Sequence, residues 1–191
     1  MQDISDGELI KRAQNKQGNP AAGAEAVGEL YDRYQESVFR YVCSRVSNPQ
    51  LAEDLTGDVF TRMVINLPKY RYTGIPFLAW LYRIARNLVI DYHRSSTSLD
   101  YLPVEQAENL GTDEKGPAQV VENQIFIEQV QSALEELKPD KQDVLILRFI
   151  VGLSLKEVAS TMGKSIDSIK ITQHRALKEI RTILESSTGI K

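Results

Sequence analysis

The sequence predicts an all-α protein built from two small helical domains joined by a flexible acidic linker. Apolar residues recur at helical spacing over residues 24–94 and again over residues 123–184, and alternating strand-like runs are missing. Between these blocks lies a segment rich in Ser, Gly, Pro and acidic residues, a composition typical of loops. A chain of 191 residues has room for one large domain or two small ones.

The domain boundaries follow from this polar segment. We expect an N-terminal domain over residues 1–95, an acidic linker over residues 96–123 and a C-terminal domain over residues 124–191. A structureless loop of this length is uncommon inside one compact domain, which favours a linker between two domains.

Charge is distributed unevenly along the chain. The 23 basic and 26 acidic residues give a net charge of −3. Residues 69–94 nevertheless carry five basic residues and one acidic residue, and residues 163–191 carry six basic and three acidic residues. Residues 95–123 carry six acidic residues and one basic residue. Local charge matters more than the total for binding a polyanion, so the two basic segments are candidate nucleic-acid surfaces.

The composition argues against several classes of function. The single cysteine, Cys43, excludes a disulfide framework, and with only two histidines the chain has too few ligands for a zinc site. Cys43 lies in a helical pattern, where we expect a small buried residue. The sequence contains no paired-carboxylate, nucleophile–base or phosphate-loop pattern. We therefore expect neither an enzyme nor a protein that binds a cofactor, a metal or a small-molecule substrate.

No segment resembles an export signal or a membrane span. Charged residues interrupt the first 16 residues, which argues against a signal peptide. The longest apolar stretch, residues 144–153, contains Arg148 and is far shorter than the roughly 20 residues that a membrane-spanning helix needs. We therefore expect a cytoplasmic protein that does not insert into a membrane.

The C-terminal block has the pattern of two short helices joined by a sharp turn. Ser154 and Glu157 form a capping box at the start of the first helix, and Ser165 is a candidate N-cap for the second. Ala159, Gly163 and Ile169 supply a small contact residue, a turn glycine and an apolar anchor, as a bihelical DNA-binding unit requires. This pattern predicts that the second domain is a helix-turn-helix domain.

The second helix of this unit has an apolar face and a polar face. The predicted apolar positions are Ile166, Ile169, Ala176, Leu177, Ile180 and Leu184. The opposite face consists of Asp167, Ser168, Lys170, Ile171, Thr172, His174, Arg175 and Lys178. Polar and basic side chains near a helix N-terminus suit the base edges of a major groove and the flanking phosphates. The alternative is a plain helical hairpin with a solvated basic face.

The N-terminal block ends in a helix that carries both aromatic and basic residues. The helix over residues 77–94 turns an apolar face to the core, and this face consists of Phe77, Trp80, Leu81, Ile84, Leu88 and Val89. The cationic and polar residues that fall largely on another face are Arg83, Arg86, Asn87 and Arg94. The loop before it, residues 69–76, has two aromatic and two basic residues. Aromatic rings stack on unpaired bases at roughly 1–3 kcal/mol per base. The alternative is that Trp80 belongs to the core and the arginines are solvated.

The preceding segment, residues 51–67, is an amphipathic helix. Its inward stripe consists of Leu55, Val59, Met63 and Leu67. Its outward side carries Asp54, Asp58 and Arg62, which on the residues alone indicate an ordinary solvated face.

In this order, the segments resemble the extracytoplasmic-function sigma factors, the small two-domain members of the bacterial sigma-70 family. Residues 30–64 resemble the helices of their first domain, and residues 77–94 (FLAWLYRIARNLVIDYHR) resemble their promoter-melting helix. Residues 134–184 resemble their second domain. The FxxWLxxIARNxxxD pattern, followed by a helix-turn-helix, carries the resemblance.

The resemblance implies a role for each matching position. Docking on the coiled coil of the largest polymerase subunit falls to Asp54, Asp58 and Phe60. Capture of a flipped minus-ten base falls to the loop residues Arg71, Tyr72 and Thr73. Binding and melting of the same element fall to Trp80, Arg83, Arg86, Asn87 and Arg94. Reading of the minus-thirty-five element falls to Lys156, Ser165, Asp167, Ser168, Lys170, Thr172, Gln173 and Arg175. The acidic linker is similar to the segment that family members thread towards the RNA exit path.

The chain departs from the family pattern at two places. Ile171, Thr172 and Gln173 replace the Ser-Arg-Leu that often follows the lysine of the recognition helix, so the family's minus-thirty-five sequence does not transfer. The stretch over residues 14–30 is longer and richer in Gly and Ala than the usual connector. We therefore expect the first helix to pack loosely.

The resemblance implies a sigma factor that confers promoter recognition and DNA melting on bacterial core RNA polymerase for transcription initiation. Its partners would be core RNA polymerase, promoter DNA and an anti-sigma factor. The alternative is a ligand- or partner-controlled helix-turn-helix repressor or activator, a dimer that reads two half-sites. Such a protein does not need the aromatic and basic segment over residues 70–87. A helical adaptor without a DNA role would require both basic surfaces to be inert.

Overall fold

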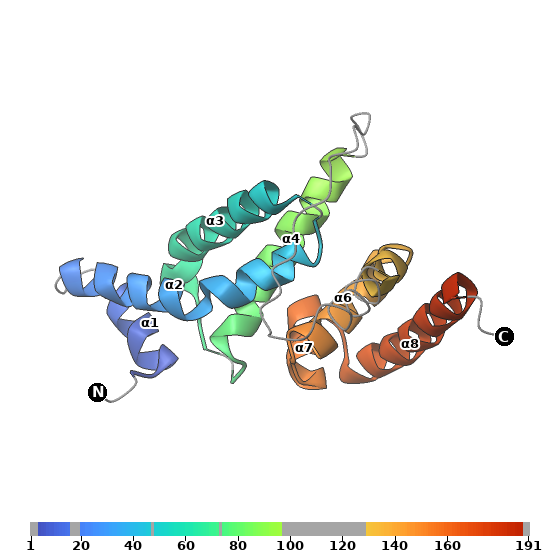
Figure 1. The fold of residues 1–191 in the computed structure, drawn as a ribbon. Coiled ribbons are helices and arrows are strands. Elements are labelled where there is room, and N and C mark those ends of the chain that lie inside the picture. The colour runs from blue at the N-terminus through green and yellow to red at the C-terminus, as the bar shows by residue number, and fades with distance from the viewer. Residues whose placement is uncertain (1–3, 16–19, 47, 73, 97–128, 189–191) are drawn as a thin grey trace, which may run out of the picture. The chain divides into compact units, whose positions relative to one another are not determined.

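The structure, a computed structural model, describes residues 4–15, 20–46, 48–72, 74–96 and 129–188 (Figure 1). These residues form helices and turns with no strand among them, which confirms the predicted all-α class. The helices are α1 (Asp6–Gln14), α2 (Pro20–Cys43), α3 (Pro49–Asn66), the 3-10 turn η1 (Leu67–Lys69), α4 (Phe77–Ser96), α6 (Pro139–Leu145), the π-helical turn η2 (Ile146–Ile150), α7 (Leu155–Met162) and α8 (Ile166–Thr188). Residues 129–135 are also helical.

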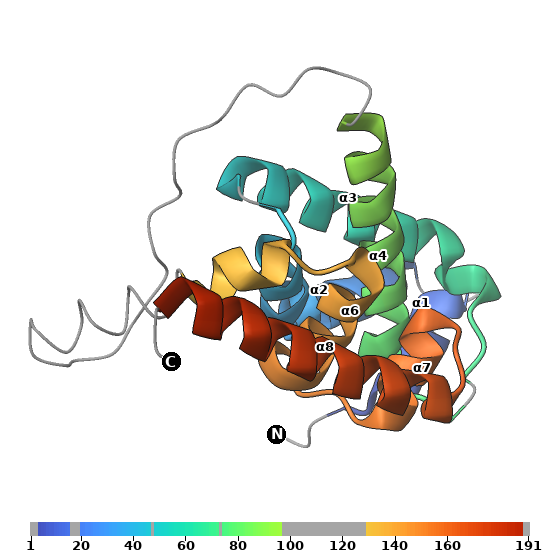
Figure 2. The same ribbon diagram turned by 90° about the vertical axis from the view of Figure 1, so that its right-hand side faces the viewer.

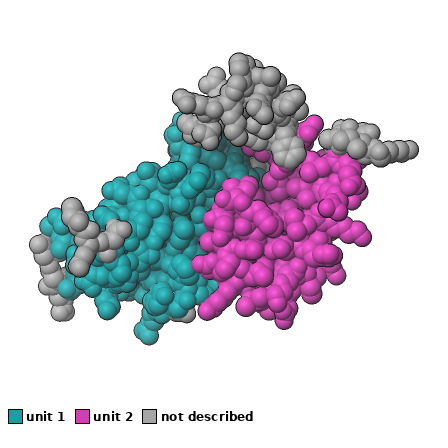
Figure 3. Space-filling view, turned by 60° about the horizontal axis from the view of Figure 1, so that its bottom comes forward, with its two compact units in different colours: residues 1–106, 160–162 teal, residues 107–159, 163–191 magenta. Residues whose placement is uncertain are grey.

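The chain divides into two compact units, which Figure 3 shows in teal and magenta. Unit 1 consists of residues 1–106 and 160–162, and unit 2 consists of residues 107–159 and 163–191. The predicted acidic linker, residues 96–123, lies outside the described residues except for Ser96.

In unit 1, helices α2, α3 and α4 pack against one another (Figures 1 and 2). The predicted inward stripe of α3 is confirmed, because all of its members are buried: Leu55, Val59, Met63 and Leu67. The side chain of Asn48 caps the start of α3, where its Oδ1 accepts hydrogen bonds from the backbone N–H groups of Gln50 and Leu51 at 2.9 and 3.3 Å. Pro49 occupies the first helical position, which needs no donor.

Helix α4 supplies the other large part of this core. Its predicted apolar face is confirmed at four positions that are fully or nearly fully buried, Phe77, Leu81, Leu88 and Val89. Trp80 and Ile84 are only partly buried. Tyr82, which is not among the predicted apolar positions, is also buried, with its ring centroid 5.4 Å from that of Tyr41. Burial raises the pKa of the Tyr82 phenol to about 12, so this side chain stays neutral.

Helix α1 corrects the expectation of a loosely packed first helix. Leu9 and Ile10 are buried, and α1 packs against α2 and η1. Asp6 at the start of α1 forms an ion pair with Arg33 of α2 at 2.7 Å and accepts a hydrogen bond from the hydroxyl of Tyr34. The partners of Asp6 lie on α2, well separated from α1 in the sequence. The composition of residues 14–30 therefore does not predict these contacts.

In unit 2, α6 and α8 lie side by side (Figures 1 and 2). A cluster of buried apolar residues, Leu134, Leu137, Leu145 and Ala176, forms part of the core, with Val130, Ile180 and Ile183 packed against it. Polar contacts fix α6 at its edges: Lys141 pairs with Glu179 of α8, and Asp140 pairs with Lys164 at 2.6 Å.

The predicted helix-turn-helix caps are confirmed. The Glu157 carboxylate accepts from the backbone N–H of Ser154 at 2.6 Å, and Ser154 Oγ accepts from the backbone N–H of Glu157 at 3.3 Å. Gly163 forms the turn with φ of 64°, a conformation that favours glycine. Ser165 Oγ accepts from the backbone N–H of Ser168 at 3.2 Å, so α8 begins where the sequence predicts.

Two predicted apolar positions of α8 are wrong. Ile166 and Leu177 are exposed, whereas Ile169 and Ala176 are fully buried. At 3.6 residues per turn, the two exposed side chains lie about 60 to 80° around the helix from Ile169. The buried stripe of α8 is therefore narrower than the sequence suggests.

Among the described helices, none combines the length and apolar character that crossing a membrane requires.

Candidate nucleic-acid and polymerase interfaces

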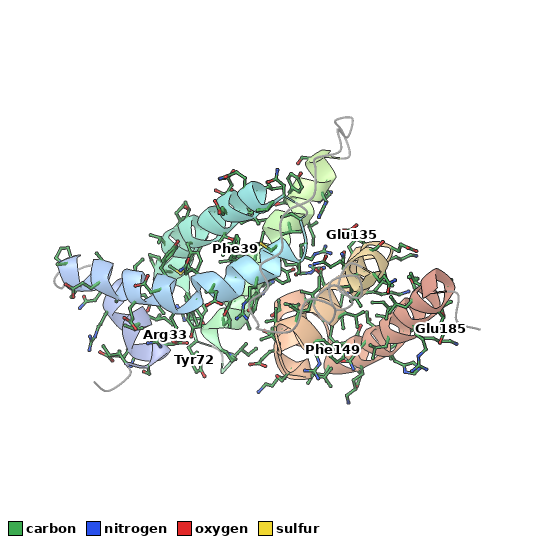
Figure 4. The ribbon with its side chains drawn as sticks, in the orientation of Figure 1. Arg33, Phe39, Tyr72, Glu135, Phe149 and Glu185 are labelled. Atoms are coloured by element: carbon green, nitrogen blue, oxygen red, sulfur yellow. The ribbon has the colours of Figure 1, made fainter. Side chains whose placement is uncertain are left out.

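The loop between η1 and α4 places an aromatic and a basic side chain in solvent. Arg71 is exposed, and the Tyr72 side chain, which is 70% exposed, projects from the loop (Figure 4). Gly74 has φ of 76°, a backbone conformation that few other residues adopt. Thr73, predicted to act with Arg71 and Tyr72, lies outside the described residues.

Behind this loop the aromatic rings of unit 1 form a cluster. The Tyr70 ring lies 4.7 Å from Trp80 and 5.2 Å from Phe77 between centroids, and Phe77 lies 5.2 Å from Trp80. Phe77 is buried, whereas Trp80 and Tyr70 are partly exposed. Trp80 therefore belongs both to the edge of the core and to the surface, which combines the two interpretations that its sequence context leaves open.

A shallow depression of about 250 Å³ opens beside this cluster, and we call it the aromatic pocket. Its lining residues are Asn66, Lys69, Tyr70, Trp80 and Ile84. Among these residues, only Trp80 is a site residue predicted from the sequence. Lys69 and Tyr70 stand in the aromatic and basic loop, but their part in a pocket depends on how η1 turns the chain back against α4.

Helix α4 presents a polar stripe that begins at Trp80. Residues 80, 83, 87 and 94 fall within about 60° of one another around a helix of 3.6 residues per turn. Arg83, Asn87 and Arg94 are exposed, so the structure brings these predicted residues to one face. Arg86 is partly buried and lies to the side of this stripe. The stripe and the aromatic pocket share Trp80, so the pocket adjoins the polar stripe. The exposed Asp91 lies on the same side of α4, between Asn87 and Arg94.

Helix α3 presents two acidic side chains in solvent. Asp54 and Asp58 are exposed, one turn apart, and Ile65 lies on the same side with 66% of its surface exposed. Phe60 corrects the prediction, because its side chain is only 5% exposed and its ring packs edge-on against Tyr31 at 4.7 Å. Phe60 supports this surface from the core and is not part of it.

The helix-turn-helix exposes one continuous face of α8, which we call the reading face. Its members are exposed and recur every three or four residues: Asp167, Lys170, Ile171, His174, Arg175 and Lys178. Lys170 lies 3.4 Å from Asp167, a weak contact on the surface. Lys156 of α7 is also exposed.

Three of the predicted minus-thirty-five residues have side chains that bond within unit 2: Ser165, Thr172 and Gln173. Ser165 caps α8, and the backbone C=O of Ser168 accepts a hydrogen bond from Thr172 Oγ1 at 2.8 Å. The carboxamide oxygen of Gln173 accepts from Arg148 Nε at 3.2 Å. The sequence predicts the helix on which these residues lie and their position on it, but not their internal hydrogen bonds. The reading face therefore consists of other side chains.

Cys43 is partly buried. Burial is the largest cause of its raised pKa, and the nearby Glu53 carboxylate raises the pKa further. Both effects disfavour the thiolate, the form that reacts with oxidants. Cys43 is less buried than its helical pattern predicts.

Comparison with known families gives two matches along the chain. Residues 30–98 match sigma-70 region 2, and residues 127–180 match sigma-70 region 4. The two matches fall on the two helical blocks, with the polar segment between them.

Curated relatives agree with these matches. The chain is 38% identical over 179 residues to the ECF RNA polymerase sigma factor BldN of Streptomyces coelicolor, covering 93% of this chain and 65% of BldN. It is 32% identical over 165 residues to SigD of Mycobacterium tuberculosis, covering 84% of this chain and 78% of SigD.

Solved structures share the fold. CnrH, in complex with the cytosolic domain of CnrY, is similar with a TM-score of 0.69 and 23% identity, covering 95% of this chain and 97% of that chain. RpoE of Bartonella quintana, in complex with the anti-sigma factor NepR, has a TM-score of 0.65 and 20% identity, covering 83% and 96% of the two chains. With both sigma-70 regions matched in order and curated relatives along most of its length, the chain belongs to the extracytoplasmic-function sigma factors of the sigma-70 family.

Proposed function

We propose that this protein confers promoter recognition and DNA melting on bacterial core RNA polymerase for transcription initiation. The observation that supports the proposal is the presence of two different candidate DNA surfaces in one chain. One is the aromatic pocket with the cationic stripe of α4, and the other is the capped helix-turn-helix with its reading face. The first suits single-stranded DNA and the second suits a duplex.

The aromatic pocket is the proposed site for an unpaired base of the minus-ten element. Tyr70 and Trp80 offer ring faces for stacking, and Lys69, Arg71 and Arg83 offer positive charge for the backbone. Taking a base out of the duplex costs a few kcal/mol, which stacking on these rings would offset. Tyr72 and Thr73 of the preceding loop, together with Arg86, Asn87 and Arg94 of α4, complete the proposed minus-ten surface.

The reading face is the proposed contact with duplex DNA of the minus-thirty-five element. Lys170, Arg175 and Lys178 suit phosphates or guanine edges. Ile171, 53% exposed among these cations, lacks a hydrogen-bonding group, and the base group that suits it is the methyl of thymine. Lys156 extends the surface on α7. Four further predicted residues are proposed to stabilise the helix-turn-helix more than to contact bases: Ser165, Ser168, Thr172 and Gln173.

The acidic face of α3 is the proposed docking surface for core RNA polymerase. Asp54 and Asp58 supply negative charge, and Ile65 supplies exposed apolar area beside them. Charge complementarity with a basic partner would raise the rate and specificity of assembly.

The division of labour follows the predicted domains. We assign minus-ten binding and polymerase docking to residues 1–95 and minus-thirty-five binding to residues 124–191. The acidic linker, residues 96–123, would join them and follow the path of the RNA. Two modest DNA-binding modules on one chain gain affinity through effective concentration.

The family consists of DNA-binding regulators, and the chemistry of RNA synthesis would belong to the polymerase. We propose that the protein has no catalytic activity of its own and acts in the cytoplasm. RpoE of Bartonella quintana is held by an anti-sigma factor in its complex, and an anti-sigma factor is among the proposed partners here. The comparisons do not favour the alternative of a dimeric helix-turn-helix repressor.

The proposal is tested by transcription from a genomic promoter library with reconstituted holoenzyme, followed by sequencing of the transcripts. We expect start sites that share two sequence elements and require the added protein. A protein that yields no promoter-dependent transcript with core polymerase, and that elutes as a dimer in gel filtration, would be a repressor instead.

A further inference from the structure

The last residue of α1 contacts the segment that forms the aromatic pocket. Gln14 Nε2 donates hydrogen bonds to the backbone carbonyl oxygens of Leu67 and Tyr70, each at 2.8 Å. Leu67 follows the end of α3, and Tyr70 follows the end of η1. One carboxamide therefore ties together both ends of this turn. At Leu67 it adds a second hydrogen bond to a carbonyl oxygen that already accepts one from the backbone N–H of Tyr70 at 3.0 Å.

Helix α1 is held firmly enough to act as a fixed support for Gln14. The apolar side chains of Leu9 and Ile10 are buried, and Asp6 pairs with Arg33 and Tyr34 of α2. Burial is the largest cause of the raised pKa of the Tyr34 phenol, and its hydrogen bond to Asp6 raises it further, so the phenol remains a donor at neutral pH. These anchors lie at the start and middle of α1, and Gln14 stands at its other end.

The Tyr70 backbone that Gln14 holds carries one wall of the pocket. The Tyr70 ring lines the pocket and packs against Trp80 at 4.7 Å between centroids. The next two residues, Arg71 and Tyr72, are the exposed side chains of the loop. A shift of the Tyr70 carbonyl would therefore move the wall of the pocket and the start of the loop together.

We propose that Gln14 is a positioning residue for capture of the minus-ten base, which it serves by fixing Tyr70 in the wall of the aromatic pocket. This inference rests on the proposed function of that pocket. Helix α1 precedes residues 30–98, the part of the chain that matches sigma-70 region 2, so it extends the minus-ten site beyond the matched region. A purely structural role would instead give Gln14 an effect on stability without an effect on base capture.

The test measures binding of holoenzyme to a single-stranded minus-ten oligonucleotide in which each base in turn is replaced by an abasic site. Stacking worth roughly 1–3 kcal/mol predicts that the wild-type protein loses about 5- to 150-fold in affinity at the captured position. In Gln14→Ala this abasic penalty is expected to shrink to less than half of its wild-type value, with the penalties at other positions unchanged.

Two further variants test whether the hydrogen-bond donors of the Gln14 side chain matter, as distinct from its size and its charge. Gln14→Lys keeps donors for the two carbonyl groups and is expected to retain most of the abasic penalty, whereas Gln14→Glu removes them and should behave like Gln14→Ala. Their opposite charges change the affinity for all oligonucleotides alike and cancel in the ratio. If Gln14→Ala does not fold, the comparison of Gln14→Lys with Gln14→Glu tests the positioning role in its place.

Val42→Ala is the matched stability control, because Val42 is a buried residue of α2 that does not line the pocket. The inference is overturned if Gln14→Ala lowers the melting temperature as Val42→Ala does and keeps the full abasic penalty. If the wild-type protein has no abasic-sensitive position, base capture in the aromatic pocket itself is wrong, and the inference falls with it.

Discussion

At the scale of single residues, the candidates for DNA contact differ in how far they are exposed and in whether their side chains bond within their own unit. Thr172 and Gln173 are engaged by neighbours within unit 2, whereas Ile171 and Arg175 extend into solvent. Trp80 is partly buried and partly available. Helix periodicity alone does not distinguish these candidate DNA-contacting residues from one another. Their exposure and their internal hydrogen bonds do.

Ile171 should make binding depend on a thymine methyl group. Replacing thymine by uracil, one position at a time, in a duplex minus-thirty-five element is expected to weaken wild-type binding about three- to fivefold at one position, the value of one buried methyl. The measurement is fluorescence anisotropy with holoenzyme. Ile171→Ala should lose this uracil sensitivity, whereas Lys178→Ala should weaken binding to all duplexes and keep it. Equal sensitivity in wild type and Ile171→Ala would contradict the assignment.

Trp80 and Arg175 should separate melting from duplex binding. Trp80→Ala removes a stacking face worth roughly 1–3 kcal/mol, so it is expected to slow open-complex formation about 5- to 150-fold while duplex affinity stays within about twofold. Arg175→Ala should weaken duplex binding and leave opening of a pre-melted template unchanged. Stopped-flow fluorescence of a 2-aminopurine promoter reports the first effect, and anisotropy reports the second. Equal losses in both assays would refute this division.

Cys43 should react slowly as a thiol. Its pKa is raised, so at a given pH the folded protein has a smaller thiolate fraction than a free cysteine, and reactivity should grow as the pH rises. The rate of iodoacetamide labelling between pH 7 and pH 10 measures this, with the urea-unfolded protein as reference. A folded protein that labels faster than the unfolded one at pH 7 would instead indicate a reactive, redox-sensitive thiol.

At the scale of elements, local sequence rules predict much of the fold. The capping box at Ser154, the N-cap at Ser165 and the buried stripe of α3 all arise from contacts within a few residues or from simple periodicity, and all are confirmed. The packing of α1 was not predictable in this way. Gln14 bonds to residues 53 and 56 positions further along the chain, and the sequence gives no indication of such pairs.

The candidate sites are predictable from the sequence only in part. The exposed residues of α4 and α8 follow from helix spacing, so the stripe and the reading face were largely predictable. The aromatic pocket depends on the turn η1, and the buried position of Phe60 depends on Tyr31 of another helix. Such features require tertiary packing, which one-dimensional periodicity does not encode.

The capping box of α7 should contribute measurably to the stability of unit 2. Ser154→Ala removes the acceptor for the Glu157 backbone N–H and is expected to cost about 0.5–2 kcal/mol in the free energy of unfolding. Chemical denaturation followed by circular dichroism provides the measurement. Lys156→Ala, at an exposed neighbouring position, is the control and should change stability by less than about 0.5 kcal/mol. A Ser154→Ala variant as stable as this control would show that the cap is unimportant.

At the scale of the whole molecule, the distribution of charge suits a subunit that acts only within a larger assembly. Two basic segments flank an acidic one, and the total charge is slightly negative. Strong free binding to any DNA is therefore not expected, because non-specific affinity grows with the number of phosphate contacts. Core polymerase would bring the two DNA surfaces to the promoter together, so that modest modules act with a high effective concentration.

The proposed function requires that promoter opening depends both on core polymerase and on the aromatic pocket of this chain. Permanganate probing of minus-ten thymines on a promoter selected from the library tests it most directly. We predict reactive thymines only when the protein and core polymerase are both present, and strongly reduced reactivity with Trp80→Ala. Thymines that react with polymerase alone, or equally with wild type and Trp80→Ala, would contradict the claim.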